Sequence, residues 1–200
     1  MAAVLRPYHP SDLAAMYRIC LLTGAAGGDA THLYRNPDLL AHLYAGPYPV
    51  ADPGLTFVVV DDEGVVGYVV GTADTPAFDA WLDAHWWPVL RAQHPVVDDP
   101  GDGTEDHVLV RRIHEGAAGP DELYDRYPAH LHIDLLPRAQ GQGWGRRLIE
   151  ALADALRARG VTGLHLGVDA RNTGAIAFYE RVGFRRERTH DWGATLVLDL

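Results

Sequence analysis

Residues 140–147 read Gln-Gly-Gln-Gly-Trp-Gly-Arg-Arg, and they stand between an apolar strand-like segment, Leu131 to Leu136, and an amphipathic helical segment, Leu148 to Arg159. Three glycines let a backbone approach a bulky anion without a clash from a Cβ atom. The free N–H groups of a first helical turn point outward at the positive end of the helix dipole. The stretch therefore predicts a cradle for a pyrophosphate at the start of the helix.

A second pattern follows downstream of the first. Residues 164–184 read Leu-His-Leu-Gly-Val-Asp-Ala-Arg-Asn-Thr-Gly-Ala-Ile-Ala-Phe-Tyr-Glu-Arg-Val-Gly-Phe, which indicates a strand, an Asn turn, a helix with Ala-x-x-Phe-Tyr, and a closing Gly-Phe. Together with the spacing of Gln140, Gly143 and Gly145, this pattern resembles the two fingerprints of the GNAT superfamily of N-acetyltransferases. Two fingerprints in the right order are far more specific than one glycine-rich loop.

Several shorter segments add a narrower resemblance, to the acetyltransferase-like C-terminal domain of O-GlcNAcase. They are Leu5-Arg6-Pro7-Tyr8, Asn36-Pro37-Asp38-Leu39, Gly67-Tyr68-Val69-Val70-Gly71-Thr72, Tyr127-Pro128 and a tryptophan-bearing insertion. In animals that domain is regarded as lacking the acetyl-CoA loop. The intact loop of this chain therefore favours binding of the cofactor, and the sequence has no glycoside hydrolase portion.

The order of the expected elements is that of a mixed α/β sheet, the acyl-CoA N-acyltransferase or GNAT fold that the resemblance implies. We expect one domain over residues 1–200, with a helical insertion at about 74–127 between the third and fourth strands. Strands are expected at residues 2–8, 56–60, 65–72, 129–136 and 162–168, followed by a closing pair that reaches residue 198. Helices are expected at residues 12–22, 36–46, 76–93, 105–114, 143–159 and 173–182, with Ser11 and Thr104 as caps of the first and fourth.

Composition narrows the class of protein. The 48% hydrophobic and 22% charged residues are ordinary for a globular chain, and no apolar stretch approaches the roughly 20 residues that span a bilayer. The N-terminal residues show no export signal, so a cytoplasmic location without membrane binding is expected. The net charge of −10 argues against nucleic acid as a partner and favours an amine-bearing substrate. Cys20 is alone, which excludes an internal disulfide.

The GNAT resemblance implies a set of residues that hold acetyl-CoA. The backbones of Leu135 and Leu136 would face the pantetheine arm and the thioester carbonyl, where an N–H group stabilises an oxyanion. Asn172 would reach the pantetheine amide, although its position also fits the N-cap of the following helix. Arg181 would approach the nucleotide end. The remaining cofactor-binding residues implied are Gln140, Gly141, Gln142, Gly143, Trp144, Gly145, Arg146, Phe178 and Tyr179.

Tyr179 is the expected general acid. A departing CoA thiolate needs a proton, and members of the superfamily place a tyrosine at this position of the motif, beside the sulfur. A phenol has an ordinary pKa of about 10, which suits a thiol leaving group. The alternative is a packed aromatic ring next to Phe178.

The general base is harder to place, because Gly167 stands where many members of the superfamily carry a glutamate. Strand alternation puts His130, His132 and Asp134 on one face, with His165 on the adjacent strand. Asp134 is the nearest to the thioester site, so we expect it to act as base or to anchor the substrate ammonium, with a structural hydrogen-bonding role as the alternative. The same three residues form a weak metal pattern, but no metal is expected.

Two other functions compete with an acetyltransferase. A dinucleotide-binding oxidoreductase would also place Gly141-x-Gly143 between a strand and a helix, with Asp169 at the ribose. Against it, Arg146 replaces a glycine and only about 30 residues follow Asp169, too few for a doubly wound sheet. The second competitor is a non-catalytic module that binds acetyl-CoA or a partner protein, which the absence of a glutamate at Gly167 favours.

The acceptor is the least determined partner. A small amine, an amino sugar, a peptide terminus and a lysine side chain all remain open, and so does a homodimer. The loop from Gly24 to Tyr34 and the insertion are expected to wall the acceptor pocket. In that insertion Trp81, Trp86 and Trp87 are expected to pack in the core or a lid, with the alternative that one lines a ligand pocket.

Overall fold

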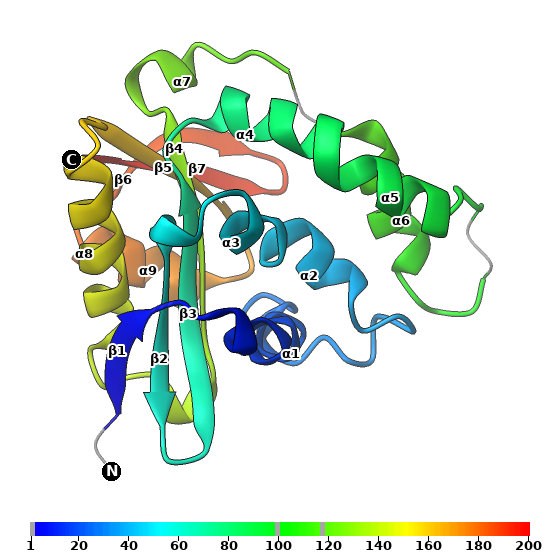
Figure 1. Cartoon of the computed structure of the whole chain (residues 1–200), viewed down its shortest axis with the longest axis horizontal. Coiled ribbons are helices and arrows are strands. Elements are labelled where there is room, and N and C mark those ends of the chain that lie inside the picture. Colours follow the sequence, from blue (N-terminus) through cyan, green and yellow to red (C-terminus); the bar gives the residue numbers. More distant parts are fainter. Residues whose placement is uncertain (1–2, 99–100, 117–118) are drawn as a thin grey trace.

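The computed structural model describes residues 3–98, 101–116 and 119–200. Its strands form a seven-stranded sheet in the order β1-β2-β3-β4-β5-β7-β6 (Figure 1). The strands are β1 (Val4–Pro7), β2 (Thr56–Asp61), β3 (Gly64–Thr72), β4 (Ala129–Leu135), β5 (Gly163–Asp169), β6 (Arg185–His190) and β7 (Gly193–Asp199). The helical segments are η1 (Pro10–Asp12), α1 (Leu13–Thr23), α2 (Leu39–Tyr44), α3 (Pro47–Ala51), η2 (Pro53–Leu55), α4 (Thr75–Trp81), η3 (Leu82–Trp86), α5 (Trp87–Gln93), α6 (Asp106–Glu115), α7 (Leu123–Arg126), η4 (Pro137–Ala139), α8 (Trp144–Arg157) and α9 (Thr173–Arg181).

The junction between β4 and β5 is the parallel one; every other pair of neighbours in the sheet is antiparallel. Its pairing is confined to Ala129 with Leu164 and His130 with His165. Beyond these pairs the two strands separate toward their C-terminal ends. The sheet is therefore closed at one end of this junction and open at the other.

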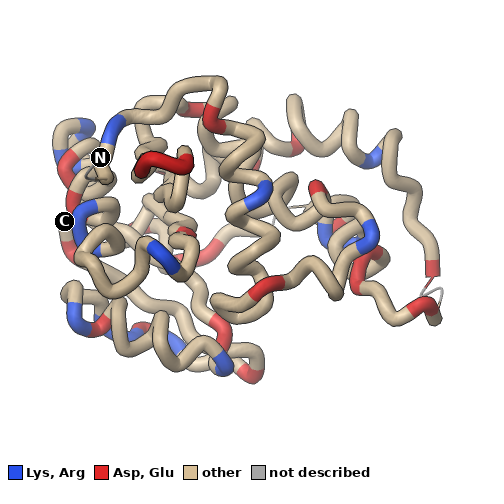
Figure 2. The backbone as a smooth tube through the Cα atoms, turned by 90° about the horizontal axis from the view of Figure 1, so that it is seen from below, with Lys and Arg blue, Asp and Glu red and all other residues tan. Residues whose placement is uncertain are grey.

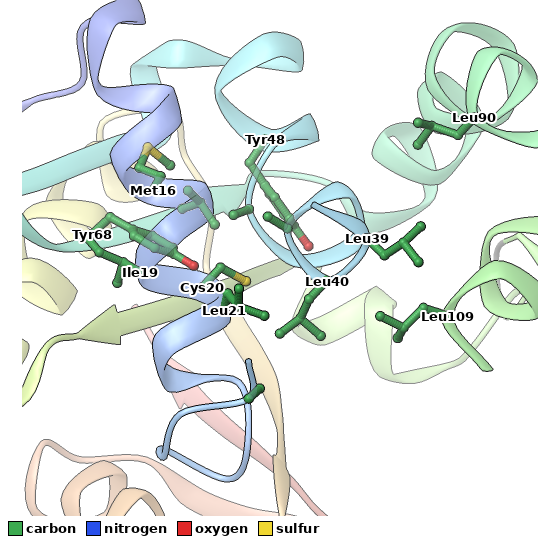
Figure 3. Close-up of a cluster of buried hydrophobic side chains, with 14 of the residues drawn as sticks. Met16, Ile19, Cys20, Leu21, Leu39, Leu40, Tyr48, Tyr68, Leu90 and Leu109 are labelled. Carbon is green, nitrogen blue, oxygen red and sulfur yellow. The ribbon is translucent and has the colours of Figure 1, made fainter. Parts of the chain in front are cut away.

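Helices cover both faces of the sheet (Figure 1), and a hydrophobic cluster lies on each face. On one face, α8 buries an apolar stripe at helical spacing, formed by Leu148, Ile149, Leu152 and Leu156. On the other face, α1 packs on β3 and β4, α2 packs on α1, and Met16 and Ile19 of α1 are fully buried there. This second cluster contains Tyr68 of β3, and Figure 3 shows the Tyr68 hydroxyl directed toward Cys20 on α1.

The insertion between β3 and β4 packs on this second cluster. Helices α4, η3 and α5 run without interruption over residues 75–93, with a π-helical turn at η3. Figure 3 shows Leu90 of α5 and Leu109 of α6 projecting toward Leu39 of α2. The indole N–H of Trp86 donates to the carbonyl of His42 at 2.9 Å. The expected packing role of the tryptophans is met by Trp86 and by the buried Trp87, and Trp81 stacks on Phe78.

Several expected boundaries are corrected. The first helix starts with a 3-10 turn that is capped by His9 and not by Ser11, because the His9 imidazole accepts the N–H of Ser11. Thr104 does not cap α6; its N–H and hydroxyl donate to Asp102. Helix α2 begins at Leu39, three residues after the expected start, and α7 was not expected at all. The expected strand residue Ala2 and part of the expected acidic loop, at 99–100, lie outside the described residues.

Charges of both signs are spread along the chain (Figure 2), with a net charge of −10. Many arginines form ion pairs with acidic side chains. Arg188, for example, donates to Asp121 through both terminal guanidinium nitrogens, at 2.6 and 2.8 Å. Within the described part of the chain, every helix falls short of the length and apolar character that a membrane span needs.

The packing of the insertion generates a stability prediction. Ile113 of α6 is fully buried among residues of the insertion and of α1 and α2. We expect Ile113→Ala to lower the free energy of unfolding by about 2 to 5 kcal/mol, because it removes buried methyl groups and leaves a cavity. Urea titrations followed by far-UV circular dichroism and by tryptophan fluorescence measure the change, and the two probes should show one coincident transition.

The control is Val108→Ala on the same helix. Val108 is 51% exposed, so we expect a change within about 0.5 kcal/mol. A separate early transition of the fluorescence in the Ile113 variant would contradict the prediction, since it would mean that the insertion unfolds apart from the sheet.

Candidate active site

A cleft of about 660 Å³ lies where β4 and β5 separate. Three segments that are far apart in the sequence line it: the end of α1 with its following loop, the end of β4 with the glycine-rich loop, and helix α9. Its residues are Thr23, Ala26, Gly27, Ile133, Asp134, Leu135, Gln140, Gly141, Gly143, Gly145, Arg146, Asn172, Gly174, Ala175, Phe178, Tyr179, Arg181 and Val182. The structure thus brings most of the expected site residues to one place.

The glycine-rich loop has the backbone that its sequence predicts. Gly141 and Gly143 have φ angles of +71° and +81°, in the left-handed region that favours glycine. Gly143 forms the N-terminal boundary of α8, and its carbonyl accepts the N–H of Arg147 at 3.2 Å. The N–H groups of the three residues between them precede this first helical hydrogen bond and point out of the helix end. The loop therefore offers several main-chain donors to an anion in the cleft.

Gly145 serves a different purpose from the two loop glycines. A Cβ atom at this position would lie 2.9 Å from Cζ of Phe178. The first turn of α8 therefore approaches α9 through a glycine, and the ring of Phe178 occupies the space that a side chain would take. This contact brings the N-terminal end of α8 and the cleft-lining side of α9 to the same opening.

The backbone of β4 directs the N–H groups of Leu135 and Leu136 to opposite edges of the strand. The N–H of Leu136 donates to the carbonyl of Val66 at 2.9 Å, so it faces β3 and is not available to a thioester. Its side chain is buried in the cluster on the α1 face. Because alternate residues of a strand direct their N–H groups to opposite edges, the N–H groups of Leu135 and Ile133 face β5. There the strands have separated, and both residues line the cleft.

Two other expected residues lie outside the cleft lining. The side-chain amide of Gln142 donates to the carbonyl of Arg138 at 2.6 Å and is exposed. The indole of Trp144 is buried on the face of the sheet that α8 covers, with the Arg147 guanidinium 4.7 Å from its ring centre. In contrast, Gln140 lines the cleft, and its amide donates to the carbonyl of Leu135 at 2.9 Å. This bond ties the loop to the end of β4.

Asn172 is both the N-cap of α9 and a residue of the cleft lining. Its side-chain oxygen accepts the N–H of Ala175 at 3.1 Å, which makes it the N-cap of α9. It also lines the cleft, where a Cβ atom on Gly27 would lie 3.5 Å from the Asn172 amide nitrogen. The loop after α1, which contains Ala26 with φ +50° and Gly27 with φ +92°, therefore closes over the start of α9.

Arg146 and Arg181 form the cationic rim of the cleft. The two residues lie on different helices, and the Arg146 guanidinium donates to the carbonyl of Arg181 at 3.3 Å. Both line the cleft. Arg147, the neighbour of Arg146, does not, because its side chain covers Trp144. The cleft thus combines main-chain donors with two positive charges.

Tyr179 is buried and lines the cleft from α9. Burial, followed by the negative charge of Asp134, raises the pKa of Tyr179 above its ordinary value. The phenol is therefore neutral at physiological pH and holds a proton to donate. The ring also packs on Phe178 and Phe184, at centroid distances of 5.4 and 5.5 Å, so packing and a cleft-facing position occur together.

Asp134 reaches the cleft from β4, opposite α9. It is half-buried, and its Oδ2 accepts the hydroxyl of Tyr68 at 2.5 Å. Burial raises the pKa of Asp134, and the hydrogen bond from Tyr68 partly offsets that rise. Asp134 and Tyr179 are thus two titratable groups on opposite walls of one cleft.

His130 of β4, which pairs with His165, is held by hydrogen bonds on both ring nitrogens. The hydroxyl of Thr75 donates to the carbonyl of Pro128 at 2.7 Å and lies 2.7 Å from Nδ1 of His130. Nδ1 therefore carries the proton, and Nε2 accepts the hydroxyl of Tyr48 at 2.8 Å. Burial holds the pKa of His130 well below its usual value, so the ring is neutral.

The metal pattern on β4 finds no support in this geometry. Both nitrogens of His130 are engaged with Thr75 and Tyr48. His165, on the adjacent strand, uses Nδ1 to bind the carbonyl of Tyr127 at 2.7 Å. Over residues 3–98, 101–116 and 119–200, no three acidic, histidine or cysteine side chains gather as a metal site would require.

Gly167 lies on β5, on the face that carries His165. A Cβ atom at Gly167 would lie 3.1 Å from Cη2 of Trp192, so the indole takes the place where other superfamily members carry a glutamate. Trp192 is 56% exposed and stacks on His190 at 4.7 Å, and His190 is held by the Thr195 hydroxyl at 2.8 Å. The indole of Trp192 therefore covers Gly167 on this face of β5.

Sequence reasoning missed some cleft residues. They are Thr23, Ile133, Gly174, Ala175 and Val182, whereas Ala26 and Gly27 belong to the loop that was expected to wall the acceptor pocket. Ile133 could have been found from strand alternation, because it shares an edge with Leu135. Thr23 had no local signal; it reaches the cleft because α1 packs on β3 and β4.

The mostly antiparallel sheet excludes the doubly wound arrangement of a dinucleotide-binding oxidoreductase, which needs consecutive parallel strands. Residues 29–184 match the family described as the Acetyltransferase (GNAT) family. Protein O-GlcNAcase of Rattus norvegicus is 23% identical over 180 residues, which are 90% of this chain and 20% of the relative. The resemblance to O-GlcNAcase is thereby confirmed, and the chain spans about one fifth of the length of that relative.

Solved structures agree in fold. The crystal structure of SsHAT is 39% identical, with a TM-score of 0.92 over 100% of this chain and 98% of that chain. A GNAT superfamily phosphinothricin acetyltransferase from Sinorhizobium meliloti, solved in complex with acetyl-CoA, is 19% identical with a TM-score of 0.58, covering 100% of this chain and 89% of that chain. The expected mixed α/β GNAT fold is confirmed, and this chain belongs to the GNAT family of acetyltransferases.

Proposed function

We propose that the chain is an acetyl-CoA-dependent N-acetyltransferase that transfers the acetyl group directly to an amine, in a ternary complex and without a covalent enzyme intermediate. The observation that carries the proposal is the cleft between β4 and β5, where the N-terminal end of α8, Tyr179 and Asp134 meet. Main-chain donors suit a diphosphate, and two proton-transfer groups on opposite walls suit acyl transfer.

In this proposal the cleft residues hold acetyl-CoA in a defined order. The N–H groups at the start of α8, with Gly141, Gly143 and Arg146, bind the diphosphate, and Arg181 binds the nucleotide end. The pantetheine arm lies in the opening between β4 and β5, with its amide near Asn172. The N–H of Leu135, which faces this opening, donates to the thioester oxygen and stabilises the oxyanion that develops there. The N–H of Ile133 faces the pantetheine arm, as was expected of Leu136.

The transfer itself moves one acetyl group and one proton. The amine nitrogen attacks the thioester carbonyl carbon, the C–N bond forms, and the C–S bond breaks. Asp134 takes the proton that the amine loses, directly or through a water, or anchors the ammonium before that step. Tyr179 gives its proton to the departing thiolate, and the phenol is restored from solvent. The products are an amide and the free thiol of CoA.

The acceptor approaches on the face of the sheet that carries Asp134 and Gly167. Ala26 and Gly27, from the expected loop of 24–34, already line the cleft. Trp192, from the β6–β7 turn, lies against Gly167 on that face. The net charge of −10 favours a cationic acceptor. The proposal covers a small amine, an amino sugar, a peptide terminus or a lysine side chain, with the chain acting as one domain.

A second candidate function has a specific observation in its favour. Gly167 and Trp192 leave the site without the glutamate that many superfamily members use, so the chain could bind acetyl-CoA and transfer nothing. Release of CoA thiol in the presence of a panel of amines separates this non-catalytic module from the enzyme.

The first test of the proposal is binding of the cofactor. We expect isothermal titration calorimetry to show binding of acetyl-CoA and no binding of NADH. Arg146→Ala should weaken acetyl-CoA binding about tenfold, because it removes a charge-assisted contact to the diphosphate.

Arg147→Ala is the matched control. It removes the same charge one residue away, from a side chain that covers Trp144 and does not line the cleft. We expect its acetyl-CoA affinity to stay within about twofold of the unmodified protein. Equal losses in the two variants would contradict the assignment of Arg146, and tight NADH binding would overturn the proposal as a whole.

The second test concerns Tyr179. We expect Tyr179→Phe to reduce kcat for amine-dependent CoA release by about 10² to 10⁴, because the thiolate then leaves without its acid. The affinity for acetyl-CoA, measured by calorimetry, should be nearly unchanged since the ring remains. An unchanged kcat would remove Tyr179 from the role of general acid and leave it a packing residue.

A further inference from the structure

Tyr68 is a buried residue of β3 that the reaction above does not use. It is paired directly with Asp134 across the antiparallel β3–β4 ladder, so both side chains leave the sheet on the same face. Tyr68 is fully buried, and its hydroxyl donates to Oδ2 of Asp134 at 2.5 Å. Asp134 itself lines the cleft, whereas Tyr68 does not. The phenol therefore binds the carboxylate from the side away from the cleft.

Asp134 has no cationic partner in the part of the chain that the structure describes. The ion pairs found there all involve other carboxylates. The titratable groups that face it are Tyr68 from β3, Cys20 from α1 and Tyr179 from α9. His132, two residues away on β4, is neutral at physiological pH because burial lowers its pKa to about 4.

The Tyr68 hydroxyl therefore stabilises the negative charge of Asp134, as arginines do for other carboxylates of this protein. A hydrogen bond to an ionised carboxylate favours its charged form, and a half-buried carboxylate without such a bond keeps its proton to higher pH. Tyr68 is the hydroxyl that donates to Asp134, because the single hydroxyl proton of Thr23 goes to the carbonyl of Ile19 at 2.8 Å. The Tyr68 ring is fixed by the core formed with α1, so its hydroxyl has a defined direction.

We propose that Tyr68 is a positioning residue, which fixes the Asp134 carboxylate toward the cleft and keeps it ionised so that it can receive a proton from the acceptor amine. The inference rests on the proposed function for the role of Asp134, but the hydrogen bond and its electrostatic effect can be tested without activity. Tyr68 touches neither acetyl-CoA nor the amine; it acts through Asp134.

The direction in which the Asp134 pKa changes follows from its hydrogen bond with Tyr68. Removal of the phenol hydroxyl destabilises the charged form of Asp134, so the pKa of Asp134 rises. We expect Tyr68→Phe to move the Asp134 titration upward by about one pH unit, as observed by NMR of protein labelled with ¹³C at the aspartate carboxyl carbon. The Asp134→Asn variant assigns the resonance.

Tyr48→Phe is the matched control. Tyr48 is also buried, and its hydroxyl binds His130 at 2.8 Å and not Asp134. The same atom is removed from a comparable environment, and the Asp134 titration should remain where it is in the unmodified protein. An unchanged Asp134 titration in Tyr68→Phe, or an equal shift in the control, overturns the proposal.

The kinetic consequence separates this inference from the proposed function. As a base, Asp134 must be ionised, so the acidic limb of kcat/KM for amine-dependent CoA release should move to higher pH in Tyr68→Phe by the shift that NMR measures. The loss of rate is therefore greatest at low pH and shrinks as pH rises. A raised titration with an unmoved acidic limb upholds Tyr68 as the partner of Asp134 and removes Asp134 from the role of base.

A second variant guards against a folding defect in Tyr68→Phe. Tyr68→3-fluorotyrosine, made by site-specific incorporation, keeps the hydroxyl and nearly the same volume and makes the phenol a stronger donor. Asp134 should then titrate at lower pH than in the unmodified protein, opposite to the change in Tyr68→Phe. An upward shift or no shift in the fluorinated protein overturns the proposal.

Discussion

β4 and β5 are paired through their main chains only where they begin, and every feature of the site depends on the point at which they part. After His130 and His165 the N–H groups on the facing edge of β4 lose their partner strand. Main-chain donors without a partner strand need another hydrogen-bond partner, and in the proposed mechanism the pantetheine arm and the thioester supply it. The separation also produces the cleft volume, because the side chains of α9 fill the opening only in part.

The rest of the molecule holds this opening in place from both faces. On one face the apolar stripe of α8 anchors the glycine-rich loop, and Gly145 lets the first turn of α8 meet Phe178 of α9. On the other face α1, α2 and the insertion share one hydrophobic cluster. Polar groups within that cluster are joined to one another; Thr75, from the start of the insertion, and Tyr48, from α3, together fix the neutral ring of His130. The insertion thus contributes to the position of β4.

Burial shifts the pKa of both titratable groups in the cleft, Asp134 and Tyr179. Burial raises the pKa of the phenol and keeps it protonated. The same burial raises the pKa of the carboxylate, and the hydroxyl of Tyr68 limits that rise. Gly167 and Trp192 replace the carboxylate that other superfamily members place on β5, so the work of a base falls to β4 in the proposed mechanism.

The family, the fold class, the hairpin of β2 and β3, and the backbone of the glycine-rich loop follow from the sequence alone, because each is encoded by local spacing and by glycine conformation. Gly141, Gly143, Asn172 and Tyr179 lie in the cleft as their motifs predict. Which main-chain groups face the opening depends on how the strands pair. Leu135 and Leu136 are adjacent in sequence, yet strand register directs the N–H of Leu136 to Val66. Thr23, Gly27 and Tyr68 join Asp134 and Asn172 through the packing of distant segments, a long-range effect that no local pattern of residues encodes.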